Sequence, residues 1–226
     1  MNKTELEQIC AGQGFALGED ALDGLAAYLE LLGKWNKVMN LVGPHALPEI
    51  LRELILDSFH LARFLEDLPL PEAPESWDFG AGAGLPGVPL RLVWQAGAYT
   101  MVEAREKRAL FLQNALAACS AHDPAHYLSR TSVYRGRAEN FISERLMQKK
   151  PGDLLISRAF MPWEKLLPFA HDGLSADGRV IFLTLTPAPV LPSELAANWK
   201  LEAERAYASP AGKQRYFWAL KKTSCL

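Results

Sequence analysis

Two acidic residues and a run of alternating glycines are the part of the sequence best suited to chemistry. Asp78 precedes Gly80, Gly82 and Gly84, and Glu103 ends the next apolar stretch. Glycine lacks a Cβ atom and tolerates positive φ, so such a loop lets a ligand approach the backbone closely. An acid about 20 residues beyond a loop of this kind is placed to accept hydrogen bonds from ribose hydroxyl groups. The pattern predicts a site for a cofactor that contains a nucleoside.

The loop fits two templates, which predict different cofactors. Gly82-x-Gly84-x-x-Gly87 spells the dinucleotide fingerprint, in which the start of the following helix faces a pyrophosphate. Asp78-x-Gly80-x-Gly82-x-Gly84 resembles the loop of S-adenosylmethionine-dependent methyltransferases, in which the acid faces the methionine part of the cofactor. Glu103 does not separate the two, because both cofactors contain a ribose. A turn that only packs a helix on a strand is the third interpretation.

Composition places the chain among globular proteins. The chain has 226 residues, with 49% hydrophobic and 22% charged, which suits one α/β domain with a small extension. The sequence contains no apolar run of membrane-spanning length, and its N-terminus lacks an apolar targeting core. Cys10, Cys119 and Cys225 are far apart and, like the histidines, show no metal-ligand spacing. We expect a cytoplasmic protein without disulfides, membrane spans or a metal site.

Charge is distributed unevenly along the chain. Residues 1–90 carry 5 Lys and Arg against 14 Asp and Glu, whereas residues 103–165 carry 11 against 7. A basic second half is compatible with nucleic-acid binding. On charge alone, an ordinary solvated surface explains the pattern better.

The elements that must position these residues follow from hydrophobic spacing. Apolar steps of three and four predict helices over 3–11, 19–40 and 47–65. A proline-rich stretch at 69–74 then separates a helical cap, residues 1–74, from the domain formed by residues 75–226.

After the seam, strands and helices alternate, which predicts a mostly parallel sheet covered on both faces. The last two strands, joined by a short turn, are expected to pair antiparallel. The predicted strands are 76–80, 98–103, 131–135, 153–157, 178–184, 199–206 and 213–221, and the helices are 86–95, 105–119, 137–148 and 163–170.

Several short motifs make the chain resemble a known family. The first motif is the glycine loop, Gly80-Ala81-Gly82-Ala83-Gly84-Leu85-Pro86-Gly87. Later in the chain come Gly136-Arg137-Ala138-Glu139 and, at the end of the fourth strand, Ser157-Arg158-Ala159. Lys34-Trp35-Asn36 and Leu56-Asp57-Ser58 lie in the opening helices. Together these residues resemble the glucose-inhibited division protein B family, bacterial 16S rRNA (guanine-N7) methyltransferases of type G, from about residue 20 to residue 222.

The resemblance implies a Rossmann-like, seven-stranded class I methyltransferase sheet with an N-terminal helical extension and with S-adenosylmethionine as cofactor. Carried over by position, Gly80 and Leu85 contact the cofactor, while Ala138 and Glu139 lie beside the adenine. Arg158 lies next to the same pocket and the incoming base. The cofactor-binding set is completed by the loop and ribose argument: Asp78, Gly82, Gly84 and Glu103.

The implied chemistry needs no general base, because guanine N7 carries a free lone pair. Arg158 is the predicted catalytic residue, since arginine pairs with guanine O6 and N7; a structural ion pair with Glu139 or Asp78 is the alternative. An RNA target must present an unstacked base, because N7 is hidden in an A-form helix. The implied partner is 16S rRNA or a precursor of the small ribosomal subunit, bound by a monomer. Trp35 is expected to pack in the core, and the substrate candidates are Lys34, Asn36, Arg52, Arg105, Arg108 and Arg215.

The chain departs from the family pattern on the expected substrate side. Glu53 follows Arg52 where the family often has Arg-His, Val42 replaces a threonine, and Thr184-Leu185-Thr186 replaces Lys-Gly. These departures keep open a methyltransferase acting on another RNA base or on a small molecule. A nicotinamide-dependent oxidoreductase rests only on the dinucleotide fingerprint. An RNA-binding assembly protein without cofactor is the non-catalytic alternative.

Overall fold

A computed structural model describes residues 1–123 and 127–223. Cys225 therefore lies outside the described residues, and Cys10 and Cys119 are buried free thiols. Among the helices of this part, none is long and apolar enough to cross a membrane. The helical elements are α1 Lys3–Gly12, α2 Glu19–Met39, α3 Leu47–Ile50, the π-helical turn η1 Leu51–Ile55, α4 Leu56–Glu66, α5 Gly87–Val93, α6 Glu106–Ser120, the 3-10 turn η2 Tyr127–Arg130, α7 Ala138–Met147, α8 Trp163–Ala170 and α9 Ser193–Ala196.

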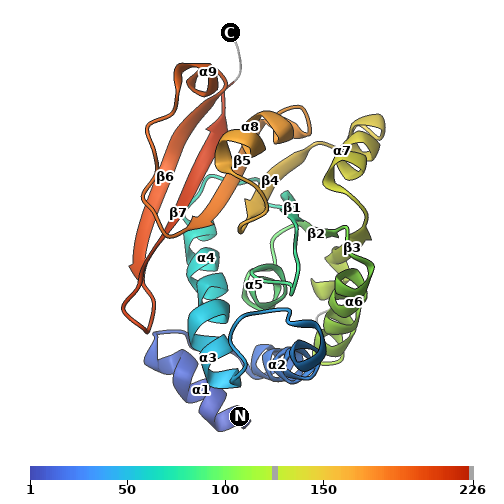
Figure 1. Ribbon diagram of the computed structural model, residues 1–226, viewed down its shortest axis with the longest axis vertical. Helices are drawn as coiled ribbons and strands as arrows, with labels where there is room; N and C mark the ends of the chain where they lie inside the picture. Colours follow the sequence, from blue (N-terminus) through green and yellow to red (C-terminus); the bar gives the residue numbers. More distant parts are fainter. Residues whose placement is uncertain (124–126, 224–226) are drawn as a thin grey trace.

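Seven strands form one sheet in the order β3-β2-β1-β4-β5-β7-β6 (Figure 1). The first five pair in parallel, and β7 is antiparallel to both β5 and β6, as the short final turn predicts. Strand order reverses between β1 and its neighbour β4, and open α/β sheets bind ligands beyond the carboxyl ends at such a point. The strands are β1 Glu75–Phe79, β2 Ala98–Glu103, β3 Thr131–Arg135, β4 Gly152–Ser157, β5 Leu174–Thr184, β6 Trp199–Ala208 and β7 Gln214–Lys222.

The register of the central strands brings the predicted site residues to one edge. Phe79, the last residue of β1, lies opposite Val102 in β2 and Ser157 in β4. The residues that follow these three in the chain are Gly80, Glu103 and Arg158. Three segments that are far apart in the sequence thus meet at the switch point.

Alternating side chains give the sheet two cores. In β4, Leu154 and Ile156 face a cluster shared with α1, α2, α4, α5 and α6, whereas Leu155 faces α7 and α8. All three side chains are completely buried, which explains why this strand is an apolar run without alternation. Both faces are covered, as the alternation of strands and helices predicts.

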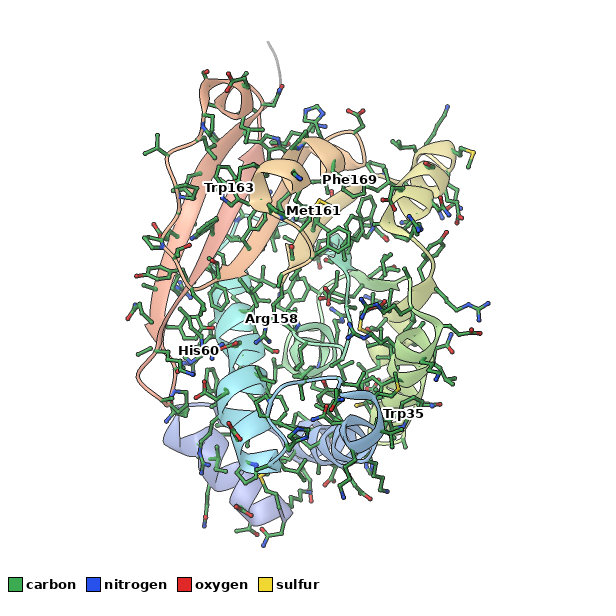
Figure 2. The ribbon with its side chains drawn as sticks, viewed as in Figure 1. Trp35, His60, Arg158, Met161, Trp163 and Phe169 are labelled. Atoms are coloured by element: carbon green, nitrogen blue, oxygen red, sulfur yellow. The ribbon has the colours of Figure 1, made fainter. Side chains whose placement is uncertain are left out.

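The N-terminal helices share their core with the sheet. Leu25 of α2 and Phe59 of α4 belong to the same buried cluster as Met101 of β2. Trp35 packs its ring against Phe111 of α6 at 5.6 Å between centroids, so its core-packing prediction is confirmed (Figure 2 labels it). The seam at residue 74 is therefore not a boundary between two cores, and the division into 1–74 and 75–226 stays a prediction.

Three local features differ from the sequence prediction. The third helix contains a π-helical turn before α4, and β5 begins at Leu174 rather than at residue 178. A short helix, α9, lies where no element was predicted.

Candidate active site

The glycine loop adopts a backbone that other residues rarely adopt. Gly80, Gly82 and Gly84 have φ values of 70°, 58° and 77°. A Cβ atom on Gly80 would stand 2.7 Å from Cδ2 of Phe160, and one on Gly84 would stand 2.6 Å from a methyl group of Val88. Both positive φ and close contacts therefore require glycine at these two positions.

Helix α2 and strand β2 hold the loop from two sides. The Tyr28 hydroxyl donates to the Ala83 carbonyl at 2.7 Å in a fully buried contact. The N–H groups of Gly80 and Ala81 both donate to the Val102 carbonyl, at 2.9 and 3.2 Å. The N-terminal helices thus help to shape the loop, besides covering the sheet.

Glu103 lies where the sequence placed it, at the end of β2. One carboxylate oxygen accepts the Gly82 N–H at 2.9 Å, and the other accepts the Arg105 N–H at 2.8 Å. The side chain is only 5% exposed. Each carboxylate oxygen can accept more than one hydrogen bond, so Glu103 can bind two hydroxyl groups without leaving the loop.

Asp78 does not line any of the cavities around the loop. It is 1% exposed, and its carboxylate accepts the Tyr99 hydroxyl at 3.2 Å and the backbone N–H of Gly87. Burial raises the pKa of Asp78 to about 7, although both hydrogen bonds oppose the shift. The start of α5 therefore faces the protein's own carboxylate. This arrangement argues against the dinucleotide interpretation, which places a pyrophosphate at the start of that helix.

The first cavity, of about 280 Å³, lies beyond the ends of β1, β2 and β3. Its walls include Gly80, Glu103 and Ala138, which the sequence predicted, together with the Phe160 ring, which it did not. The lining also contains Arg105 and Arg108. An apolar slot beside a buried carboxylate suits a nucleoside, with the base against the slot and the ribose against the acid.

A middle cavity, of about 240 Å³, continues from the first and shares Gly80 and Ala159 with it. Leu85 and the segment 41–43 also line it. Asn36 fixes this segment, because its side chain donates to the Pro44 carbonyl at 2.9 Å and accepts the N–H of residue 42 at 2.9 Å. Asn36 is 1% exposed, so it shapes the middle cavity and is not placed to contact RNA.

Arg158 follows β4 and lies beside α4 in the centre of the molecule (Figure 2). One guanidinium nitrogen lies 3.3 Å from the Asp57 carboxylate, and another donates to the Leu54 carbonyl at 3.4 Å. The same Asp57 accepts Arg215 at 2.5 Å and the Tyr207 hydroxyl at 2.7 Å. The structural partner of Arg158 is therefore Asp57, and not Glu139 or Asp78 as the sequence suggested.

Burial and charge act in opposite directions on this cluster. Burial raises the pKa of Asp57 above its ordinary value, while Arg158 and Arg215 oppose that rise. Glu53 adds a second carboxylate, 3.0 Å from Arg215. Two carboxylates thus face two guanidinium groups, and we treat the cluster as a neutral ionic network.

The structure separates the remaining candidates by location. Arg52 is exposed and lines a different cavity against α1, and Lys34 pairs with Glu30 on the surface of α2 at 2.6 Å. Gly84 packs under the loop against Val88 and Leu112. Glu139 is exposed at the start of α7, next to the cavity-lining residue 138. None of these four residues lines the first or the middle cavity.

Sequence reasoning missed Phe160, Tyr207 and Lys213. The last two lie on β6 and in the turn before β7, and they reach the site only because this hairpin folds against α4. Asp57 is a buried acceptor that ties α4 to this hairpin through Tyr207 and Arg215. Tyr207 lies on the half-buried side of β6, and strand alternation is the sequence signal for such a position.

Comparison with known proteins gives consistent matches along most of the chain. A sequence model of the family described as rRNA small subunit methyltransferase G matches residues 21–188. The chain is 49% identical over 221 residues to the ribosomal RNA small subunit methyltransferase G of Nitratidesulfovibrio vulgaris, covering 98% of this chain and 94% of that protein. The protein of the same name from Oleidesulfovibrio alaskensis is 46% identical over 223 residues, covering 96% and 92%.

Among solved structures, a mutant of MtNAS in complex with S-adenosylmethionine is similar with a TM-score of 0.57. The match covers 98% of this chain and 78% of that chain at 14% identity, so it concerns the fold alone. The predicted fold class, a Rossmann-like seven-stranded sheet with a helical N-terminal extension, is confirmed.

Proposed function

We propose a specific reaction for this chain, which belongs to the rRNA small subunit methyltransferase G family: transfer of a methyl group to N7 of one guanine in 16S rRNA. Membership of the family makes the chain an S-adenosylmethionine-dependent rRNA methyltransferase. The base, the atom and the roles of individual residues are the finer content of the proposal. The family resemblance of the sequence is thereby confirmed.

The observation that carries the proposal is the buried carboxylate of Glu103 beside the glycine loop. A carboxylate held by two backbone N–H groups is ready to accept ribose hydroxyls without reorganisation. Gly80 leaves the room that a Cβ atom would fill, and Ala138 and Phe160 offer an apolar slot for adenine. The residues present therefore fit S-adenosylmethionine, with its methionine part toward the middle cavity and Leu85.

S-adenosylmethionine supplies an electrophilic methyl group on a positively charged sulfur. In the proposed transfer this carbon would bond to guanine N7, and the carbon–sulfur bond would break with its electron pair left on sulfur. No proton is removed before attack, so the protein must mainly align the reacting atoms and limit water. Arg158 cannot pair with O6 and N7 together during transfer, because the N7 lone pair must point at the methyl carbon. We assign Arg158 to O6 alone, which corrects the bidentate expectation.

The remaining parts of the proposal concern partner and setting. Arg105 and Arg108 at the first cavity, and Arg215 near Arg158, are the cations placed to meet RNA phosphates or the base. We propose that the substrate is 16S rRNA, naked or in a precursor of the small subunit, and that the enzyme acts in the cytoplasm. We also propose a monomer, since exposed apolar side chains of the described residues are spread over α2, α6, α7, β6 and the segment after β5.

The test uses 16S rRNA and 30S subunits from a strain that lacks the gene. The purified enzyme is incubated with each in the presence of S-adenosylmethionine labelled in its methyl group, and the RNA is digested to nucleosides. The proposal predicts that label appears as N7-methylguanosine from at least one substrate. Label in another nucleoside, or in a small-molecule fraction, would favour the alternative methyltransferase interpretation instead.

A further inference from the structure

A third cavity, of about 320 Å³, lies beyond the other two and opens between α4 and the sheet. It shares Leu54, Arg158 and Ala159 with the middle cavity, which in turn shares Gly80 and Ala159 with the first. The three cavities therefore follow one another around the end of β4. Ala159 lines all three cavities, so a ligand in the first and a ligand in the third approach each other there, with Arg158 on the side of the third.

The walls of the third cavity are apolar on one side. Leu54 from η1 and Leu183 from β5 contribute half-buried surface, and Leu185 lies at the mouth with 68% of its surface exposed. Apolar walls that leave one end open suit the face of a flat ring that enters from solvent.

The other side of the cavity is polar but electrically balanced. Asp57 and Glu53 compensate Arg158 and Arg215, whose side chains are only 22% and 12% exposed. Lys213 pairs with Glu53 at 3.7 Å near the rim, where its side chain is 68% exposed, and brings the cluster to three cations around two carboxylates. An uncharged base fits the balanced interior, and a phosphate fits the cation at the rim.

We propose that the third cavity is the subsite for the target base, and that Asp57 is a positioning residue that holds Arg158 toward it; this inference rests on the proposed function. The contact of Arg158 with the Leu54 carbonyl is long at 3.4 Å, so this donor is the one available to a base oxygen. The contact with Asp57 uses the other terminal nitrogen of the same planar group, so it does not compete for this donor.

Asp57 has a second consequence for the reaction. Methylation at N7 moves positive charge from sulfur onto the base, and an uncompensated guanidinium nearby would oppose that change. Arg158 can therefore orient the base without repelling it only while Asp57 carries negative charge. Asp57 thus has two roles: it holds Arg158 in position, and it compensates the charge of Arg158 while the base becomes positive.

The apolar wall is tested with Leu185→Ala and its matched control Met147→Ala. Both residues are apolar and exposed, at 68% and 76%, but Met147 lies at the end of α7, away from the cavity. Single-turnover methyl transfer to the RNA that accepts label measures the effect. We expect the single-turnover rate constant divided by the half-saturating RNA concentration to fall about tenfold for Leu185→Ala, as for lost contacts in an apolar pocket, and to stay unchanged for Met147→Ala.

The positioning role is tested with Asp57→Asn, which keeps the shape of the side chain and removes its charge. We expect the single-turnover rate with saturating RNA to fall about a hundredfold, as for loss of a group that acts in the transition state. Binding of S-adenosylhomocysteine, measured by calorimetry, should stay within about twofold, because Asp57 does not line the first cavity. A merely structural role would change both measurements together. Should Asp57→Asn fail to fold, the Leu185 pair decides the assignment.

The outcomes separate the two levels of inference. Transfer by the wild-type enzyme with a selective loss in Leu185→Ala supports the base subsite. Equal activity of Leu185→Ala and Met147→Ala, while the wild-type enzyme methylates RNA, overturns the subsite and leaves the proposed function intact. Absence of any transfer by the wild-type enzyme overturns the proposed function and the subsite with it.

Discussion

Replacement of Glu103 by glutamine perturbs the cofactor site with the least change of shape. Both carboxylate oxygens accept backbone N–H groups, from Gly82 and from Arg105. Glutamine keeps one acceptor and presents an NH₂ group in place of the other. One of the two backbone donors must then face another donor, so the Glu103→Gln loop cannot keep its present hydrogen bonds.

The magnitude follows from the two sets of hydrogen bonds that change. A hydrogen bond to a charged group contributes about 1.5–3 kcal/mol, and a buried donor left without an acceptor costs about 1–3 kcal/mol. The ribose hydroxyls lose a charged acceptor, and part of the loop must shift. We expect a loss of about 2–4 kcal/mol in binding free energy, or a roughly 30-fold to 1000-fold higher Kd for S-adenosylmethionine.

Titration calorimetry with S-adenosylmethionine and S-adenosylhomocysteine measures the effect, with Glu106→Gln as the matched control. Glu106 lies three residues later, but its side chain is 79% exposed and pairs with Arg135 at the surface. The control should bind like the wild-type protein. Unchanged affinity of Glu103→Gln, with an intact fold, would refute the assignment of this carboxylate to the ribose.

Three further predictions concern stability and the loop. Burial raises the folded-state pKa of Asp78 from 3.8 to about 7, so the folded protein loses stability as pH rises through this range. In urea unfolding, the free energy of unfolding of Asp78→Asn should therefore rise relative to that of the wild type between pH 4 and 8, by up to about 4 kcal/mol. A difference that does not change with pH would contradict this. Arg91 is fully buried and donates to four carbonyl groups at the end of α5, so Arg91→Met should lower the free energy of unfolding by about 3–5 kcal/mol, whereas a loss below about 1 kcal/mol would contradict that role. Gly84→Ala, with φ 77° and a Cβ atom 2.6 Å from Val88, should lower the free energy of unfolding by about 1–3 kcal/mol. Gly12→Ala, with open space around it, should leave it unchanged, and equal effects of the two substitutions would contradict the strain argument.

The sequence predicted the cofactor side of the site because its signals are local. Glu103 ends an apolar strand, the glycine loop follows another, and the parallel register brings their ends together. The same argument placed Arg158 after β4. These predictions needed only strand order and the rule that parallel strands end at one edge.

The contacts of Asp57 could not be predicted in the same way. Its partners Tyr207 and Arg215 lie 150 and 158 residues further along the chain, and they reach it through the antiparallel hairpin. Periodicity gives the buried face of a helix but not the element that covers it. Asp78 shows the same limit, since its side chain turned toward α5 rather than toward the cavity.

The directions of three other side chains, those of Lys34, Asn36 and Arg52, also could not be predicted. The family resemblance placed all three near the substrate, yet Asn36 points into the fold and Arg52 points toward α1. Lys34 forms an ion pair with Glu30, one turn earlier on the exposed face of α2. A motif fixes the residue type, whereas the turn of the helix decides where its side chain lies.

The most direct test of the central claim is the N7-methylguanosine content of 16S rRNA from cells that lack the gene. We predict that one such nucleotide is lost, that the wild-type gene restores it, and that the gene carrying Glu103→Gln restores it poorly while Glu106→Gln restores it fully. A 16S rRNA whose N7-methylguanosine content is the same with and without the gene would contradict the proposed reaction.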